Sequence, residues 1–131
     1  MLDTLIERIR AAHENNLPLI LQGGGSKTFY GNADEGEVLA TRALNGVVDY
    51  QPKELVLTAR AGTPLAEIEA LLGEQNQMLA FEPPHFGGPA TLGGSIAAGL
   101  SGPRRPYAGA ARDFVLGVRM IDGTGQPLRF G

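Results

Sequence analysis

Two glycine-rich segments carry the residues of this chain whose types and spacing could bind an anion. The first is Gln22-Gly23-Gly24-Gly25-Ser26-Lys27, and the second covers residues 90–99. Both expose backbone N–H groups without side chains in the way, and glycine lets successive N–H groups turn toward one phosphate. One such loop can hold a phosphate, so two that converge could hold the pyrophosphate of a dinucleotide.

The first segment adds a hydroxyl donor at Ser26 and a positive charge at Lys27. It departs from a P-loop because Ser26 occupies the place of the glycine that precedes the lysine. It also departs from the Rossmann fingerprint, because Thr28 stands where the last glycine would be. The departure from the Rossmann fingerprint disfavours NAD binding. The departure from the P-loop disfavours a nucleotide hydrolase of the P-loop type. A plain tight turn after a strand stays open as the alternative.

The second segment combines hydroxyl groups with small residues that let a flat ligand approach the backbone. Its candidate ligand contacts are Thr91, Leu92, Gly93, Gly94, Ser95, Ala98 and Gly99. Thr91 and Ser95 can donate hydroxyl hydrogen bonds, and the glycines leave the backbone open. The alternative is a glycine-rich turn that packs on a neighbouring element.

Other residues near the second segment are further candidates for ligand contact. Pro83 and Pro84 form a stiff wall for a planar ring, and the adjacent arginines 104 and 105 could balance phosphate charge or be solvated. His85 could act as a base, but no carboxylate or serine partner can be placed beside it. No group of residues suggests nucleophilic catalysis, and two distant histidines without cysteine make a metal site improbable.

The composition excludes several functional classes. The 131 residues carry a formal charge of −3, so a large nucleic-acid footprint is not expected. The absence of cysteine excludes disulfides and iron–sulfur ligation within this chain and is compatible with a reducing cytoplasm. No apolar run approaches the ~18 residues of a membrane span, and the N-terminus does not read as a signal peptide. The final residues read as a strand, which suggests a fragment of a longer protein.

Periodicity predicts helices and strands mixed without a regular βαβ repeat, and therefore an α+β fold. We expect a break near Pro52 that separates a subdomain of residues 1–52 from a second, incomplete one of residues 53–131. Thr63 is expected to cap a helix that Pro64 begins and that runs to about residue 75. The other expected elements are a helix over 2–15, strands over 18–22, 38–41, 47–50, 55–60 and 114–122, an extended piece over 79–81, a loop-like stretch over 83–109, and a hairpin into 128–130.

These motifs, in this order, resemble the FAD-binding (PCMH-type) domain shared by vanillyl-alcohol oxidase, p-cresol methylhydroxylase and UDP-N-acetylenolpyruvoylglucosamine reductase. That family has a strand that runs into a Gly-Gly-Gly-Ser/Thr loop, and later a Thr-hydrophobic-Gly-Gly loop. An Arg-Tyr-Gly-like stretch and an Asp-hydrophobic-Val-Leu-Gly strand follow, which match residues 105–109 and 113–117. Within the family, residues 82–87, 102–106, 112–117 and 128–131 resemble the smaller FAD-binding subunits of bacterial glycolate oxidases.

The resemblance implies two small α/β subdomains that clasp FAD, the second of them truncated here. It implies cofactor contacts from Gln22, Gly23, Gly24, Gly25, Ser26, Lys27, Pro83, Thr91, Leu92, Gly93, Gly94, Ser95, Ala98, Gly99 and Gly102. Non-covalent FAD is expected, because the first loop lacks the histidine or cysteine to which some members attach it. No catalytic residue can be carried over, and the chain alone is expected to be inactive and to bind FAD weakly or not at all.

The resemblance further implies oxidation of glycolate, a small 2-hydroxy acid, to glyoxylate by hydride transfer to flavin. The implied partners are a larger FAD-containing subunit and an iron–sulfur subunit. The implied location is the cytoplasm, peripheral to the inner membrane through those partners. Two alternatives stay open: the same fold acting on lactate, another alcohol or a UDP-sugar, and a scaffold subunit that has lost its cofactor.

Overall fold

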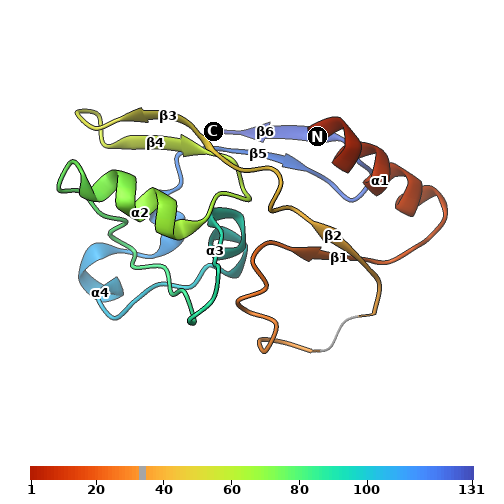
Figure 1. Ribbon diagram of the computed structural model, residues 1–131, viewed down its shortest axis with the longest axis horizontal. Coiled ribbons are helices and arrows are strands. Elements are labelled where there is room, and N and C mark those ends of the chain that lie inside the picture. The colour runs from red at the N-terminus through yellow and green to blue at the C-terminus, as the bar shows by residue number, and fades with distance from the viewer. Residues whose placement is uncertain (33–34) are drawn as a thin grey trace.

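The computed structural model describes residues 1–32 and 35–131. Helices and strands are mixed along the chain, which confirms the predicted α+β class (Figure 1). The elements are α1 (Leu2–Glu14), β1 (Leu19–Gln22), β2 (Glu37–Ala40), β3 (Val47–Gln51), β4 (Val56–Ala59), α2 (Leu65–Gly73), α3 (Leu92–Ala98), α4 (Arg105–Ala108), the 3-10 helix η1 (Ala111–Phe114), β5 (Val118–Ile121) and β6 (Pro127–Phe130).

Within the described residues, the strands form three separate two-stranded sheets. The pair β1–β2 is parallel, with Leu19 opposite Glu37, whereas β3–β4 and β5–β6 are antiparallel hairpins. A parallel pair needs a long connection, and the first glycine segment begins that connection directly after β1. The expected subdomain boundary at Pro52 falls in the turn between β3 and β4, and it stays a prediction.

Three of the buried apolar side chains lie on one face of α2. Leu65 and Ile68 of this helix are fully buried, and Leu72 lies one turn further along the same face. Leu39 of β2 and Phe81 of the following loop are buried as well. Each such side chain contributes roughly 1.5–3 kcal/mol by leaving water. The core therefore fixes α2, which in turn positions the segments on either side of it.

The prediction that Thr63 caps α2 is wrong. The side chain of Thr63 is completely buried, and its hydroxyl accepts from the N–H of Gly46 (2.9 Å) and donates to the carbonyl of Gly46 (3.2 Å). Pro64 instead precedes the helix, and no side-chain cap is formed. The N–H of Leu65 donates to the carbonyl of Ala90 (2.9 Å), so the start of α2 is tied to the second glycine segment.

Three further expectations differ from the structure. The loop-like stretch 83–109 contains α3 and α4, although glycine is a poor helix former, because Thr91 caps α3 and Gly99 ends it with a left-handed backbone. The expected strand 114–122 is reduced to β5, preceded by η1. The expected extended piece 79–81 instead turns at residues 80 and 81, where the Glu82 N–H donates to the Leu79 carbonyl at 3.1 Å.

Helix α1 lies between β2 and the β5–β6 hairpin (Figure 1). Arg8 forms an ion pair with Glu37 and donates to the carbonyl of Val38 at 3.1 Å. On its other side, the hairpin turn packs so closely that a Cβ at Gly125 would lie 2.5 Å from Cγ of Arg10. The first helix and the last hairpin are therefore packed together.

No helix in residues 1–32 and 35–131 is long and apolar enough to cross a membrane. Over the same residues, no group of three or more His, Cys, Asp or Glu side chains could hold a metal ion.

We predict that the β5–β6 turn loses stability at acid pH through Asp122. Two hydrogen bonds lower the pKa of this carboxyl below its ordinary value of 3.8: the larger effect comes from the Thr124 hydroxyl and the next from the N–H of Gln126. A pKa that is lower in the folded than in the unfolded chain stabilises the fold above the unfolded pKa, and this stabilisation is lost as the pH falls through the folded pKa. Asp122→Ala should therefore lower the midpoint temperature of thermal unfolding at neutral pH. The difference in midpoint between the variant and the wild type should disappear at acid pH. Glu54→Ala, in the β3–β4 turn, is the control, and a gap independent of pH would contradict the prediction.

Candidate functional site

The two glycine segments lie directly against each other in the structure. A Cβ at Gly24 would overlap the carbonyl of Pro89, and a Cβ at Gly23 would overlap the hydroxyl of Thr91. Close by, a Cβ at Gly88 would lie 3.1 Å from the side chain of Ser26. The two segments therefore do converge, and Gly23 and Gly24 lie where a side chain would not fit.

The first segment holds the available backbone donors. Among the described residues, the N–H groups of residues 23–27 make no hydrogen bond to the protein. Gly25 has a φ of +74°, a left-handed conformation that glycine adopts without strain and that turns neighbouring N–H groups toward one side. The Gln22 amide lies against Gly25, 2.8 Å from where its Cβ would be, and residues 22–27 are half-buried. These donors can therefore serve an anion without first breaking an internal bond.

The second segment differs from expectation, because its backbone donors are already used. The Leu92 N–H donates to Thr63 (2.9 Å), and the Gly93 N–H donates to Ala61 (2.7 Å). The Gly94 N–H donates to the Thr91 hydroxyl at 3.3 Å. These bonds hold the segment against the start of α2. The second segment can therefore form a wall of a binding site, but its N–H groups at Leu92, Gly93 and Gly94 are not available to a ligand.

Gly93 has a packing role that the sequence did not reveal. A Cβ at this position would lie 2.7 Å from Cβ of Ala61 and 2.9 Å from the Ala61 carbonyl oxygen. The glycine is therefore required for α3 to approach the turn after β4. Substitution at Gly93 would disturb this packing before it disturbed any ligand.

Ser95 is buried to 1% exposure, and its hydroxyl finds no hydrogen-bond partner among the described residues. A buried polar group without a partner costs about 1–3 kcal/mol. The neighbouring Thr91 is also buried, with 3% exposure. The Ser95 hydroxyl is thus a buried polar group of the second segment that residues 1–32 and 35–131 leave without a hydrogen bond.

The remaining predicted residues are spread around the ends of α3 and the loops beside it. Gly99 ends α3 and lines a hollow of about 420 Å³ with Arg105 and Arg112, at the opposite end of the helix from Thr91. Ala98 is the last residue of the same helix. Gly102 donates its N–H to the carbonyl of Phe81 at 2.9 Å. The structure therefore does not bring these residues to the contact between Gly24 and Pro89.

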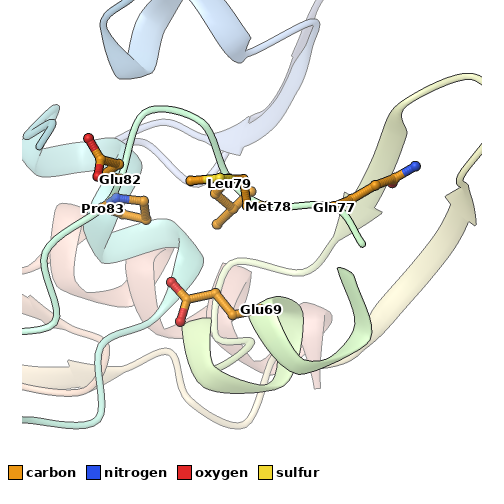
Figure 2. Close-up of a pocket in the computed structure, with 6 residues that line it drawn as sticks. All are labelled: Glu69, Gln77, Met78, Leu79, Glu82 and Pro83. Carbon is orange, nitrogen blue, oxygen red and sulfur yellow. The ribbon is translucent and has the colours of Figure 1, made fainter. Parts of the chain in front are cut away.

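Pro83 lies in a second hollow, of about 360 Å³, between α2 and the segment that follows it (Figure 2). Glu69 comes from α2, whereas Gln77, Met78, Leu79, Glu82 and Pro83 come from residues 77–83. Two carboxylates make this hollow unfavourable for a phosphate or a substrate carboxylate. An anion is better placed at the first glycine segment, beside Lys27.

His85 has a carboxylate partner that sequence reasoning did not find. Its Nε2 atom lies 2.9 Å from each carboxylate oxygen of Glu69, and both side chains are half-exposed. The two residues belong to α2 and to a proline-rich loop, so no periodicity in the sequence relates them. The expectation that no carboxylate stands beside His85 is therefore wrong, and the pair anchors the loop that leads into the second glycine segment.

Comparison with protein families gives a match to the model of the FAD binding domain over residues 2–131. The glycolate oxidase subunit GlcE of Escherichia coli is 53% identical over 97% of this chain, which spans 36% of that protein. The mitochondrial D-lactate dehydrogenase [cytochrome] 1 of Saccharomyces cerevisiae is 26% identical over 88% of the chain, which spans 20% of it. The chain thus spans about a third or less of these relatives.

Among solved structures, an alkyldihydroxyacetonephosphate synthase superposes on 98% of the chain with a TM-score of 0.75 and 25% identity. The chain corresponds to 25% of that structure. This likeness extends over nearly every described element, so it supports the arrangement of the two glycine segments as a property of the fold.

We predict that Gly24→Ala separates the two segments. The added methyl group would meet the Pro89 carbonyl, and forcing extra volume into a packed contact costs about 1–3 kcal/mol. The free energy of unfolding, measured by denaturant titration, should fall by that amount. Gly73→Ala, where a Cβ meets nothing within 4 Å, should be neutral or slightly stabilising. Equal stability of both variants would contradict the contact.

Proposed function

Because this chain belongs to the family of FAD binding domains, we propose that it forms the pyrophosphate-binding part of a flavin-dependent 2-hydroxy-acid oxidase subunit, with glycolate as the substrate. The observation that carries the binding role is that the N–H groups of residues 23–27, held against the second segment, make no hydrogen bond within residues 1–32 and 35–131. The substrate rests on the relative that is 53% identical and is named a glycolate oxidase subunit.

The residues present fit the cofactor of this family. The first segment offers backbone donors, the Ser26 hydroxyl and the Lys27 charge to two phosphate groups. Backbone donors balance phosphate charge without many lysines, which suits a chain with a formal charge of −3.

We assign the cofactor contacts in two groups. Direct donors to the pyrophosphate are the residues of the first segment, namely Gln22, Gly23, Gly24, Gly25, Ser26 and Lys27. The second segment, from Thr91 to Ser95, shapes the opposite wall and holds the first segment in place. Pro83, Ala98, Gly99 and Gly102 are proposed to lie along the rest of the cofactor. Attachment is non-covalent, since the first segment contains neither histidine nor cysteine.

When bound, FAD would supply the redox chemistry, namely a flavin acceptor for the hydride removed from C2 of a 2-hydroxy acid. The residues of this chain hold and orient the cofactor, and none of them is assigned a catalytic role. The names of the relatives support the substrate class, because glycolate and D-lactate are both 2-hydroxy acids. D-Lactate is therefore the second candidate substrate.

The proposed assembly follows from the same relative, which is named as a subunit. We propose a larger FAD-containing subunit and an iron–sulfur subunit as partners, which would accept the electrons that leave this flavin. We further propose a cytoplasmic location, peripheral to the inner membrane through these partners.

Lys27→Met should weaken FAD binding roughly tenfold, because a charge-assisted contact to phosphate is lost. Flavin fluorescence during titration with FAD measures the affinity, for the chain alone and for the assembled complex. Lys53→Met is a matched control: it removes the other lysine, which is exposed in the β3–β4 turn. If both variants bind FAD as tightly as the wild type, Lys27 does not contact the cofactor.

In the assembled complex without oxygen, glycolate should bleach the flavin absorption band faster than D-lactate does. The two acids differ by one methyl group, for which a fitted pocket discriminates roughly tenfold or more. Stopped-flow absorption gives both rates. Faster reduction by D-lactate would move the assignment to the second candidate substrate.

A further inference from the structure

The hollow at the Gly99 end of α3 differs in charge from the hollow beside Pro83. Arg105 and Arg112 line it and no carboxylate of the described residues does, whereas the hollow beside Pro83 is lined by two glutamates. We name the former the arginine hollow. The two volumes are comparable, about 420 Å³ and about 360 Å³. Of the two, the arginine hollow is the one that suits a small anion, because its charged groups attract one.

The charges of both arginines are available to a ligand. Within the part of the chain that the structure describes, Arg105 makes no ion pair. Oδ1 of Asp113 lies 4.0 Å from Nε of Arg112, but both side chains are more than half exposed, and a contact of this kind contributes little. Oδ2 of the same aspartate accepts the N–H of Ala110 at 2.8 Å. The described residues therefore leave both guanidinium groups able to bind an anion.

The rest of the wall of the arginine hollow is short and apolar. Ile96 and Val115 supply branched side chains, and Ala110 and Ala111 supply methyl groups on residues that are 7% and 2% exposed. At Gly99 the wall has no side chain, and a Cβ there would meet no described atom within 4 Å. The volume is in the range of small-ligand pockets. Two cations beside a short apolar wall fit a short-chain carboxylic acid.

Hydrogen bonds hold the two segments that carry the arginines. The N–H of Ala111 donates to the Ser101 hydroxyl at 3.0 Å, which ties η1 to the loop after α3. The N–H of Gly109 donates to the carbonyl of Arg105 at 3.0 Å, which closes α4. A binding site depends on supporting bonds of this kind, because they fix the backbone from which its charged groups extend. Both arginines are therefore positioned before a ligand arrives.

The arginine hollow is separate from the contact between the two glycine segments. Helix α3 has seven residues, which span roughly 10 Å at the rise of an α-helix. Thr91 caps one end of this helix, and the hollow lies at the other end, beside Gly99. An anion in the hollow therefore does not compete with a phosphate for the N–H groups of residues 23–27.

We propose that the arginine hollow binds the carboxylate of the 2-hydroxy acid, with Arg105 and Arg112 as the residues that select and orient it. This inference rests on the substrate class proposed above. Guanidinium groups match a carboxylate because their parallel N–H groups donate to both of its oxygens. The apolar wall then faces the carbon atoms of the acid. Gly99, which we place along the cofactor, is part of that wall, so the hollow joins the substrate to the cofactor.

The test follows the backbone amide signals of the 131-residue chain by nuclear magnetic resonance while glycolate is added. Glycolate should shift the signals of Gly99, Ala110 and Ala111, whereas ADP should shift those of residues 23–27. Arg105→Met and Arg112→Met should each weaken glycolate binding roughly tenfold, because a charge-assisted hydrogen bond is lost. Neither variant should change the affinity for ADP.

Two further variants and a neutral ligand serve as controls. Arg104→Met removes the same charge from the neighbouring position, which does not line the hollow, and it should bind glycolate within roughly twofold of the wild type. Arg105→Lys keeps the charge but loses the fork of donors, so it should recover part of the affinity. Glycolamide, the neutral amide of glycolate, should bind equally to the wild type and to Arg105→Met. Circular dichroism verifies the fold of each variant.

In the assembled complex, the same variants separate the substrate from the cofactor. Arg105→Met and Arg112→Met should raise KM for glycolate roughly tenfold, because both remove binding of the substrate carboxylate. Flavin fluorescence should show the same FAD affinity in these variants as in the wild type. A merely structural role of the arginines would weaken both ligands together.

The outcomes separate this inference from the function on which it rests. If glycolate reduces the flavin of the assembled complex with the same KM in the wild type and in both variants, the hollow is not the substrate site, while the proposed function stands. If inorganic phosphate displaces glycolate as readily as oxalate does, the hollow does not select carboxylates and the inference is wrong. If the wild-type complex binds FAD but neither binds nor oxidises glycolate or D-lactate, the proposed substrate class fails, and the inference with it.

Discussion

The close approach of two backbone segments is the constraint on which the rest of this site depends. Gly23 and Gly24 face Thr91 and Pro89 at distances that exclude a Cβ on either glycine. Because the interior of a protein is close-packed, such a contact cannot absorb even one added methyl group without displacement. The glycines are therefore needed for the assembly of the site as well as for access of a ligand to the backbone.

The two glycine segments have different roles in the proposed site. The second is held by its own hydrogen bonds to the turn before α2, and Thr63 extends this network to Gly46 at the start of β3. The N–H groups of Leu92, Gly93 and Gly94 are engaged in this way, so the second segment serves as the wall against which the first segment is placed. In the part of the chain that the structure describes, the N–H groups of residues 23–27 have no partner, and this costs less there because residues 22–27 are only half-buried. Binding and positioning are thus assigned to different segments.

Charge placement agrees with this division. The hollow beside Pro83 is lined by two carboxylates, whereas the only charged side chain in residues 22–27 is that of Lys27. Glu69 is bonded to His85, so one of the carboxylates serves to anchor the loop before the second segment. An acidic chain can therefore present a local site for an anion, because a few free N–H groups and one ammonium act at short range while the net charge acts weakly through water.

The sequence by itself determined the local elements and the class of ligand. The apolar spacing of α1, the strands and the buried face of α2 depends on neighbours along the chain, and the glycine segments mark backbone that can approach a phosphate. Tertiary structure alone decided which of those groups are free. In the folded chain the N–H groups of Leu92 and Gly93 are hydrogen-bonded, and the buried Thr63 hydroxyl bonds to Gly46. His85 is paired with Glu69. The fold also sets Phe86 against Phe29. Each of these depends on residues distant in the sequence that meet only when the core around α2 packs, so no local pattern could record them.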